Sequence, residues 1–254
     1  MKFGLIMCED AKHLGGEIGL GKFMQARFNE REPNIHEWTI IKAVTGSLPN
    51  TVERLTYDGF VISGAHYSAN NELEWIRKLE RFVQEIDKHN KTLGTKKIKI
   101  FGICFGHQVI ANAFGGKVDI NTKRNFIFGA TKVMLEEDFV AKAYFQNAFG
   151  DLQREHFTIM ESHGDFVSVV PESSTVLGWS EDCAVEVLGY GQYILSMQGH
   201  PEYNEQLLRE LMPRKTFLSG DQKEQVLRAF KMVDEAAMIE LVKNYLIERN
   251  QLEA

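Results

Sequence analysis

Hydrophobic residues gather in short runs along the first half of the chain. Runs rich in β-branched and aromatic residues occupy positions 2–7, 38–44, 57–63 and 98–103, and their length and composition are typical of buried strands. A helical pattern around residues 20–30 separates the first two runs. Nearly continuous apolar strands that alternate with helices predict a parallel sheet covered by helices on both faces.

Segment 73–90 has a clear helical periodicity. Its apolar residues recur at spacings that place them on one side of a helix, with charged residues elsewhere. The stripe consists of Leu73, Ile76, Leu79, Phe82, Val83 and Ile86. We therefore expect an amphipathic helix that connects the third strand to the fourth.

The hydrophobic pattern of the chain changes after Gly116. Shorter strand-like runs follow one another with turn residues between them, which predicts an antiparallel section beside the parallel sheet. These runs are 126–135, 156–160, 165–170, 174–180, 184–190 and 193–198. From Ser219 onward, apolar residues at three- and four-residue spacing predict one or two C-terminal helices. We expect a main domain, residues 1–212, with a helical extension, residues 213–254, packed on it.

Charge and cysteine content narrow the class of protein. The formal net charge of −6 is spread without a long basic block, which disfavours nucleic acid and membrane surfaces as partners. Cys8, Cys104 and Cys183 are far apart and form no C-x-x-C pair, so neither a disulfide framework nor a structural zinc site is expected. The chain has neither a signal-like start nor an apolar run long enough to cross a bilayer. These features predict a cytoplasmic protein.

One cysteine occupies a tight corner. The stretch "GICFG", from Gly102 to Gly106, has the G-x-nucleophile-x-G form of a strand that turns sharply into a helix. The positive end of a helix dipole favours the thiolate, so Cys104 is a candidate nucleophile. The N–H of Phe105 points the same way and is a candidate donor to an oxyanion.

A nucleophilic thiol needs a base, and the base needs an orienting acid. The strongest candidates are His200 and Glu202 in "MQGHPEY". Asp165, in "ESHGD", is a rival acid, because the order Cys104, Asp165, His200 matches the nucleophile, acid, base order of α/β-hydrolases. The residues alone leave the acid open between Glu202 and Asp165. We expect His107, just past the corner, to have a structural or supporting role.

Two further loops have possible functions. Backbone N–H groups of Gly64 or Ala65, in "VISGAHYSA", can face the cysteine as a second oxyanion donor, because neighbouring parallel strands end at the same edge. The stretch from Gly16 to Lys22 approaches a phosphate-binding loop, but Phe23 stands where a hydroxyl must reach Mg²⁺. We interpret its glycines as a mobile loop that rims the active-site mouth.

Four segments together resemble the class I, triad-type glutamine amidotransferases: "VISGAHYSA", "GICFGHQVIANAFGG", "ESHGD" and "MQGHPEY". The resemblance implies a flavodoxin-like sheet with Cys104 as nucleophile, His200 as base and Glu202 as acid. It also implies that the substrate is contacted by Gln108 and by the loop of His163 and Gly164. Neither a metal nor a cofactor is expected.

The resemblance extends to stand-alone members. The oxyanion loop and segment 119–133 differ from the pattern of synthetase-linked members, and the remaining tail is too short for an ammonia-accepting domain. The chain is similar to γ-glutamyl peptidases, which implies cysteine-dependent hydrolysis of glutamine, or of a γ-glutamyl peptide such as glutathione or a conjugate, through a γ-glutamyl thioester. The alternatives are a glutaminase that delivers ammonia to a separate synthetase, a cysteine hydrolase of the dienelactone type, and a silent binding module.

Overall fold

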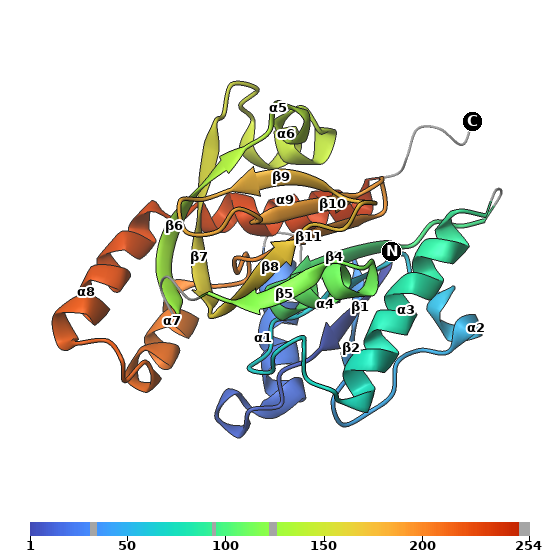
Figure 1. Ribbon diagram of the computed structural model, residues 1–254, viewed down its shortest axis with the longest axis horizontal. Coiled ribbons are helices and arrows are strands. Elements are labelled where there is room, and N and C mark those ends of the chain that lie inside the picture. The colour runs from blue at the N-terminus through green and yellow to red at the C-terminus, as the bar shows by residue number, and fades with distance from the viewer. Residues whose placement is uncertain (31–34, 93–94, 122–125, 249–254) are drawn as a thin grey trace.

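A nine-stranded mixed sheet forms the centre of the structure, a computed structural model that describes residues 1–30, 35–92, 95–121 and 126–248 (Figure 1). Five neighbouring strands on one side of the sheet run parallel. In spatial order they are β2 (Glu37–Lys42), β1 (Lys2–Met7), β3 (Gly59–Ile62), β4 (Lys99–Ile103) and β11 (Ile194–Met197). This is the strand order of a flavodoxin-like sheet.

The other four strands of the large sheet are antiparallel to their neighbours. They are β10 (Val187–Tyr190), β9 (Thr175–Trp179), β6 (Ile127–Leu135) and β7 (His156–His163). Strands β5 (Lys117–Ile120) and β8 (Asp165–Val169) form a separate antiparallel pair. The predicted fold, a parallel sheet with an antiparallel section, is confirmed.

Helices cover both faces of the parallel strands. Side chains alternate between the faces, so Leu5 and Ile6 of β1 belong to two different hydrophobic clusters. Helices α1 (Gly16–Asn29) and α9 (Glu235–Ile247) pack in the cluster that contains Leu5, whereas α3 (Glu74–Asn90) and α4 (Phe105–Ala113) pack in the cluster that contains Ile6. The structure therefore has the three layers expected of an open α/β sheet.

Further α-helices surround this core. They are α2 (Thr51–Arg54), α5 (Glu137–Val140), α6 (Ala143–Phe149), α7 (Glu205–Leu211) and α8 (Gly220–Ala229). A third hydrophobic cluster joins residues of α7 and α8 to Met160 and Tyr203, and in Figure 1 these two helices lie at one end of the molecule, beside β6 and β7. The predicted C-terminal helices are confirmed as α8 and α9. The boundary at residue 212 stays a prediction.

Two local expectations are wrong. Gly16, Gly19 and Gly21 lie inside α1 rather than in a mobile loop. They permit close packing: a Cβ on Gly19 would lie 2.4 Å from the Leu14 carbonyl oxygen, and one on Gly21 would lie 2.7 Å from Cγ2 of Ile40. Leu73 is the N-cap of α3 and is exposed, so it lies outside the predicted apolar stripe.

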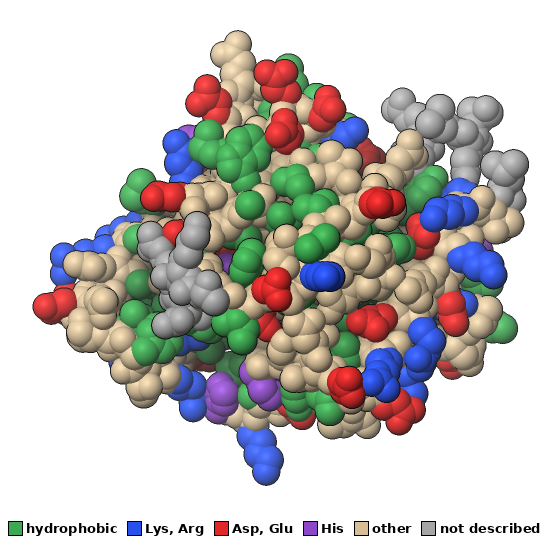
Figure 2. Space-filling view, viewed as in Figure 1, with side chains coloured by type: hydrophobic (Ala, Val, Ile, Leu, Met, Phe, Trp, Pro, Cys, Tyr) green, Lys and Arg blue, Asp and Glu red, His purple; other side chains and the backbone are tan. Residues whose placement is uncertain are grey.

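The surface carries charges of both signs. On the face shown in Figure 2, acidic and basic side chains of the described residues are interspersed with hydrophobic ones. Within the part of the chain that the structure describes, no helix has the length and apolarity needed to cross a membrane.

Candidate active site

Cys104 lies at the corner between β4 and α4 in a strained backbone conformation. Its φ is 50° and its ψ is −102°, and it is the sole non-glycine residue among those described with a positive φ. Such geometry costs about 1–3 kcal/mol and persists where the surrounding structure enforces it, commonly at functional sites. The predicted sharp strand-to-helix turn is therefore present.

The glycines of "GICFG" make this corner possible. A Cβ on Gly106 would lie 2.4 Å from the carbonyl oxygen of Ile62, and one on Gly102 would lie 2.5 Å from Cδ1 of Ile110. Real Cβ atoms do not approach other atoms so closely. The first turn of α4 can thus lie directly against β3 because Gly106 lacks a side chain, and against β4 because Gly102 lacks one.

The imidazole of His200 is brought to Cys104 by sheet topology. Strand β11 pairs in parallel with β4, so the two strands end at the same edge, and the N–H of Cys104 donates to the carbonyl of Met197 at 2.9 Å. Just beyond β11, the N–H of His200 donates to the carbonyl of Met160 at 2.8 Å. A Cβ on Gly64 would lie 3.0 Å from Cε1 of His200 and 3.5 Å from Cβ of Cys104, so both side chains surround this glycine.

Glu202, and not Asp165, holds the ring of His200. Nδ1 of His200 lies 2.8 Å from Oε1 of Glu202, and both side chains are buried. The Asp165 carboxylate instead accepts a hydrogen bond from the Ser68 hydroxyl at 2.6 Å. This geometry favours Glu202 over Asp165 as the orienting acid, and it differs from the arrangement that a dienelactone-type hydrolase requires.

The surroundings of His200 favour its protonated form. Burial acts to lower its pKa, but negative charge on Tyr203, Glu202 and Cys104 outweighs burial and raises the pKa well above the usual value. Burial also raises the pKa of Tyr203 itself. Nε2 of His200 is buried and makes no hydrogen bond of normal geometry with the described residues, which leaves it available to the thiol or to a substrate.

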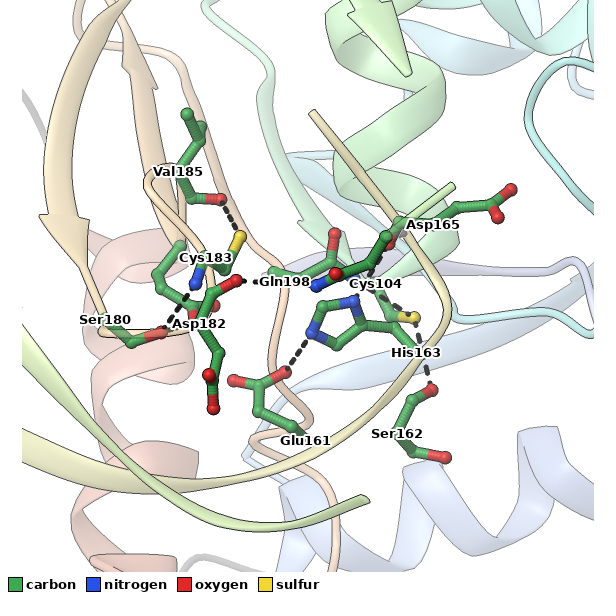
Figure 3. A network of polar contacts seen from close by, with 12 residues as sticks. Cys104, Glu161, Ser162, His163, Asp165, Ser180, Asp182, Cys183, Val185 and Gln198 are labelled. Carbon is green, nitrogen blue, oxygen red and sulfur yellow. Dashed lines mark hydrogen bonds and ion pairs between the residues drawn. The ribbon is translucent and has the colours of Figure 1, made fainter. Parts of the chain in front are cut away.

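Gln198 contacts the sulfur directly. Its Nε2 donates to Sγ of Cys104 at 3.5 Å, while the Ser162 carbonyl oxygen lies 4.0 Å from the same sulfur (Figure 3). Gln108 in turn donates from its Nε2 to Oε1 of Gln198 at 3.1 Å and to the backbone carbonyl of Asp165 at 2.8 Å. The Gln108 amide group thus orients the Gln198 amide group, which reaches the thiol. The sequence-based interpretation missed Gln198, although it lies within "MQGHPEY", two residues before His200.

The predicted oxyanion donors surround the corner. Phe105 is the first residue of α4, so its N–H has no acceptor within the helix. The hydroxyl of Ser63 donates to the carbonyl of Gly64 at 2.9 Å and accepts from the N–H of Cys8 at 2.9 Å, which fixes the peptide between Gly64 and Ala65. Both residues of that peptide line the same cavity as Cys104.

Two buried histidines are neutral. Burial lowers the pKa of His163 to about 4, and burial, with a smaller effect of the neighbouring His163, lowers the pKa of His107 to about 3. His163 hydrogen-bonds through Nδ1 to the backbone oxygen of Asp165 at 2.9 Å, and both His163 and Gly164 line the cavity. His107 is fully buried and pairs with the Ser196 hydroxyl at 2.8 Å, which agrees with its expected supporting position.

Two buried carboxyls behind the site were not anticipated. Glu161 lies 3.5 Å from Nε2 of His163, and the hydroxyl of Ser180 donates to Glu186 at 2.6 Å. Burial raises the pKa of Glu186 to about 7, and burial together with the charge of Glu186 raises that of Glu161 well above its usual value. No sequence pattern indicates that these distant residues meet.

The cavity above Cys104 has a volume of about 870 Å³, within the usual range of small-molecule sites. The triad candidates, Gln108 and the two substrate-loop residues line it. Lys12, His13 and Leu20, which flank the start of α1, also line it, as do Phe126 and Lys215. The segment around α1 therefore borders the mouth as expected, although it is helical.

The other two cysteines, Cys8 and Cys183, lack the features of a reactive thiol. Burial raises the pKa of the Cys8 and Cys183 thiols, which keeps both protonated.

At the rim of the cavity, ligand atoms of Glu9, Asp10 and His66 lie within 4.8 Å of one another. Glu9 already pairs with His66 and accepts from the N–H of Ala11, so these contacts explain the cluster without a metal.

Known proteins and one protein family are similar to the part of the chain that contains the candidate active site. The profile of the family described as glutamine amidotransferase class-I matches residues 26–219. Gamma-glutamyl peptidase 5 of Arabidopsis thaliana is 35% identical over 178 residues, which are 70% of this chain and 66% of that protein. A glutamine-hydrolyzing GMP synthase subunit of Pyrococcus abyssi is 32% identical over 64% of this chain and 80% of that protein.

The fold has solved relatives. The crystal structure of a glutamine amidotransferase from Thermotoga maritima superposes with a TM-score of 0.72 over 98% of this chain and 99% of that one, at 18% identity. At this identity the likeness concerns the fold alone. The alignment to the plant peptidase spans about two thirds of that protein's length.

Proposed function

Because the chain belongs to the class-I glutamine amidotransferase family, we propose that it hydrolyses a γ-glutamyl amide through a thioester on Cys104. The observation that carries the proposal is the convergence of a strained, cavity-lining cysteine with the Glu202-paired imidazole of His200. A nucleophile, a base and an orienting acid are the parts that acyl transfer from an amide requires.

The first half-reaction forms the thioester. The thiol proton resides on His200, and the Cys104 thiolate attacks the γ-carbonyl carbon, which moves the carbonyl π electrons onto oxygen. N–H groups of Phe105 and of the Gly64–Ala65 peptide stabilise this oxyanion, each good donor contributing about 3–4 kcal/mol. The oxyanion collapses, the C–N bond breaks, and the imidazolium of His200 transfers its proton to the departing amine.

The second half-reaction restores the enzyme. His200, now neutral, accepts a proton from a water molecule as that water attacks the thioester carbonyl. The C–S bond breaks, glutamate leaves, and the thiolate and imidazolium form again. Glu202 keeps the ring in one orientation throughout, while Gln108 and the loop of His163 and Gly164 contact the glutamyl group.

Two observations favour a peptide substrate over a synthetase-coupled role. The cavity, about 870 Å³, lies in the upper part of the range of sites that bind drug-sized molecules, and the plant relative carries the name of a γ-glutamyl peptidase. The runner-up is a glutaminase that supplies ammonia to a separate synthetase, which the match to one component of a GMP synthase supports. We place the protein in the cytoplasm, where glutamine and γ-glutamyl peptides are both available.

The test is to incubate the purified protein with glutamine, glutathione and γ-glutamyl dipeptides and to measure released glutamate. We expect release from the γ-glutamyl peptides by the wild type and none from Cys104→Ser. Cys183→Ser, which changes a buried thiol that does not line the cavity, is the matched control and retains turnover. Equal turnover by Cys104→Ser contradicts the proposal, and activity confined to glutamine supports the runner-up.

A further inference from the structure

Lys215 presents an ammonium group in the wall of the active-site cavity. It follows the short helical turn Met212–Arg214 and lines the same cavity as Cys104. Its Nζ donates to the hydroxyl of Ser162 at 3.2 Å and lies 4.6 Å from the ring centroid of Phe128. No ion pair joins it to a carboxylate of the residues that the structure describes.

This ammonium is close to the reacting sulfur. Ser162 contacts both groups, because its hydroxyl accepts from Lys215 and its carbonyl oxygen lies 4.0 Å from Sγ of Cys104. Burial lowers the pKa of Lys215, and the charge of Cys104 acts in the opposite direction. A partly desolvated cation that has aromatic rings but no carboxylate of the described residues beside it is an incompletely paired group, and a carboxylate of a ligand can complete the pairing.

Lys215 lines the same cavity as His200, the proposed proton donor to the leaving group. The imidazole of His200, which protonates the leaving amine, stacks on Tyr203 with ring centroids 4.3 Å apart. Tyr203 belongs to a hydrophobic cluster with Met212 and with Phe128. Phe128 is one of the two rings over which the ammonium lies. His200, Tyr203 and Lys215 all line the cavity, and this cluster links the base to the side chains around the ammonium.

Carboxylates line a different part of the cavity. Glu9 and Asp10 follow β1, and Asp165 begins β8. These groups are hydrogen-bonded to His66, Tyr67 and Ser68, which all belong to the loop after β3. A negative wall suits the α-ammonium of a γ-glutamyl group, whereas the wall with Lys215 suits a carboxylate on the other side of the scissile bond.

We infer that Lys215 determines specificity by binding the free carboxylate of the amino acid or peptide that is released. This inference rests on the proposed hydrolysis. It defines the substrate class as γ-glutamyl peptides whose leaving group ends in a carboxylate. The ammonia released from glutamine carries no such group.

The test compares γ-glutamylalanine with its C-terminal amide, which differ only in the charge that Lys215 contacts. We expect the wild type to have a kcat/KM at least about tenfold higher for the acid, the size of one charge-assisted hydrogen bond. Lys215→Met keeps the aromatic contacts and removes the charge, so the acid-to-amide ratio falls at least about fivefold, toward the value set by the remaining cavity cations Arg214 and Lys12. Lys215→Arg retains most of the preference. Lys231→Met removes an exposed lysine outside the cavity and keeps the wild-type ratio.

The ratio within one variant does not depend on how much of the protein is folded, so a destabilised variant still gives an answer. An unchanged preference in Lys215→Met, or an equal loss on acid and amide, overturns this inference and leaves the hydrolase intact. Absence of glutamate release by the wild type from every γ-glutamyl compound overturns the proposed function, and this inference with it.

Discussion

Nδ1 of His200 lies 2.8 Å from Oε1 of Glu202, and the two side chains are buried together at the end of β11. The carboxylate fixes which face of the imidazole, and which nitrogen, points toward Cys104. The short link between the two residues, through Pro201, means that one stretch of chain supplies both base and acid.

The first prediction concerns the identity of the acid. Glu202→Gln removes the charge that orients and stabilises the imidazolium, and we expect kcat to fall about 10²- to 10⁴-fold. Asp165→Asn disturbs a hydrogen bond to Ser68 and leaves kcat within about tenfold of the wild type. The kcat of each variant is measured from the steady-state rate of glutamate release. The reverse order of effects supports the hydrolase-like arrangement instead.

The second prediction concerns pH. The pKa of His200 is raised well above its usual value, so its imidazolium persists through neutral pH and is lost on the alkaline side. Activity should therefore fall as pH rises through the raised pKa. Because the Glu202 carboxylate contributes to the rise, Glu202→Gln should move the alkaline limb of the kcat/KM profile to lower pH. A limb that stays in place, or moves to higher pH, contradicts this account.

The third prediction concerns Gln198, which we propose as a positioning residue. Gln198→Leu removes the N–H that contacts Sγ of Cys104 and leaves the Gln108 amide without one of its acceptors. Loss of a buried hydrogen-bond partner costs about 1–3 kcal/mol, and we expect kcat to fall about 10- to 100-fold with a smaller change in KM. Because Gln198 donates directly to the sulfur, the pH profile of the rate at which Cys104 is alkylated should also differ from that of the wild type.

The matched control for Gln198 is Gln206→Leu, since Gln206 is an exposed glutamine on α7. It should retain the wild-type kcat and alkylation profile. If Gln198→Leu alters thermal stability alone, with kcat per folded molecule and the alkylation profile unchanged, the residue has only a structural role.

The fourth prediction concerns the glycine corner. Gly106→Ala forces a methyl group against the Ile62 carbonyl oxygen, and overpacking of this kind costs about 1–3 kcal/mol. Denaturant unfolding should show that loss, accompanied by lower activity, because α4 must move relative to β3. Gly220→Ala, at a position where nothing lies within 4 Å of the added atom, should be neutral. Equal stability of the two variants would show that the corner is not sterically constrained.

The local sequence pattern was sufficient to predict the sharp turn that contains Cys104. Glycines on both sides of Cys104, a preceding strand and a following helix are all adjacent in sequence, so their constraint can be recognised without tertiary contacts. The same holds for His200 and Glu202, which one short segment contains. The family resemblance inferred from these segments is confirmed by the match over residues 26–219.

Contacts between distant segments were beyond prediction from the sequence. Nothing local indicates that Lys215 approaches Ser162, or that Glu161 and Glu186 share a buried site behind the cavity. The Gly16–Gly21 region was misjudged for a related reason. Glycine has low helix propensity, but packing of α1 against β2 overrides it.

The central claim is that Cys104 carries the γ-glutamyl group. It is tested most directly by acid-quenching the enzyme during turnover of a γ-glutamyl peptide and locating the adduct by peptide mass spectrometry. We predict that the peptide that contains Cys104 gains the mass of one γ-glutamyl group and that hydroxylamine removes this adduct. The adduct should be more abundant in a variant with slowed deacylation and absent in Cys104→Ser. Turnover with no adduct on Cys104, or with the adduct on another residue, contradicts the account.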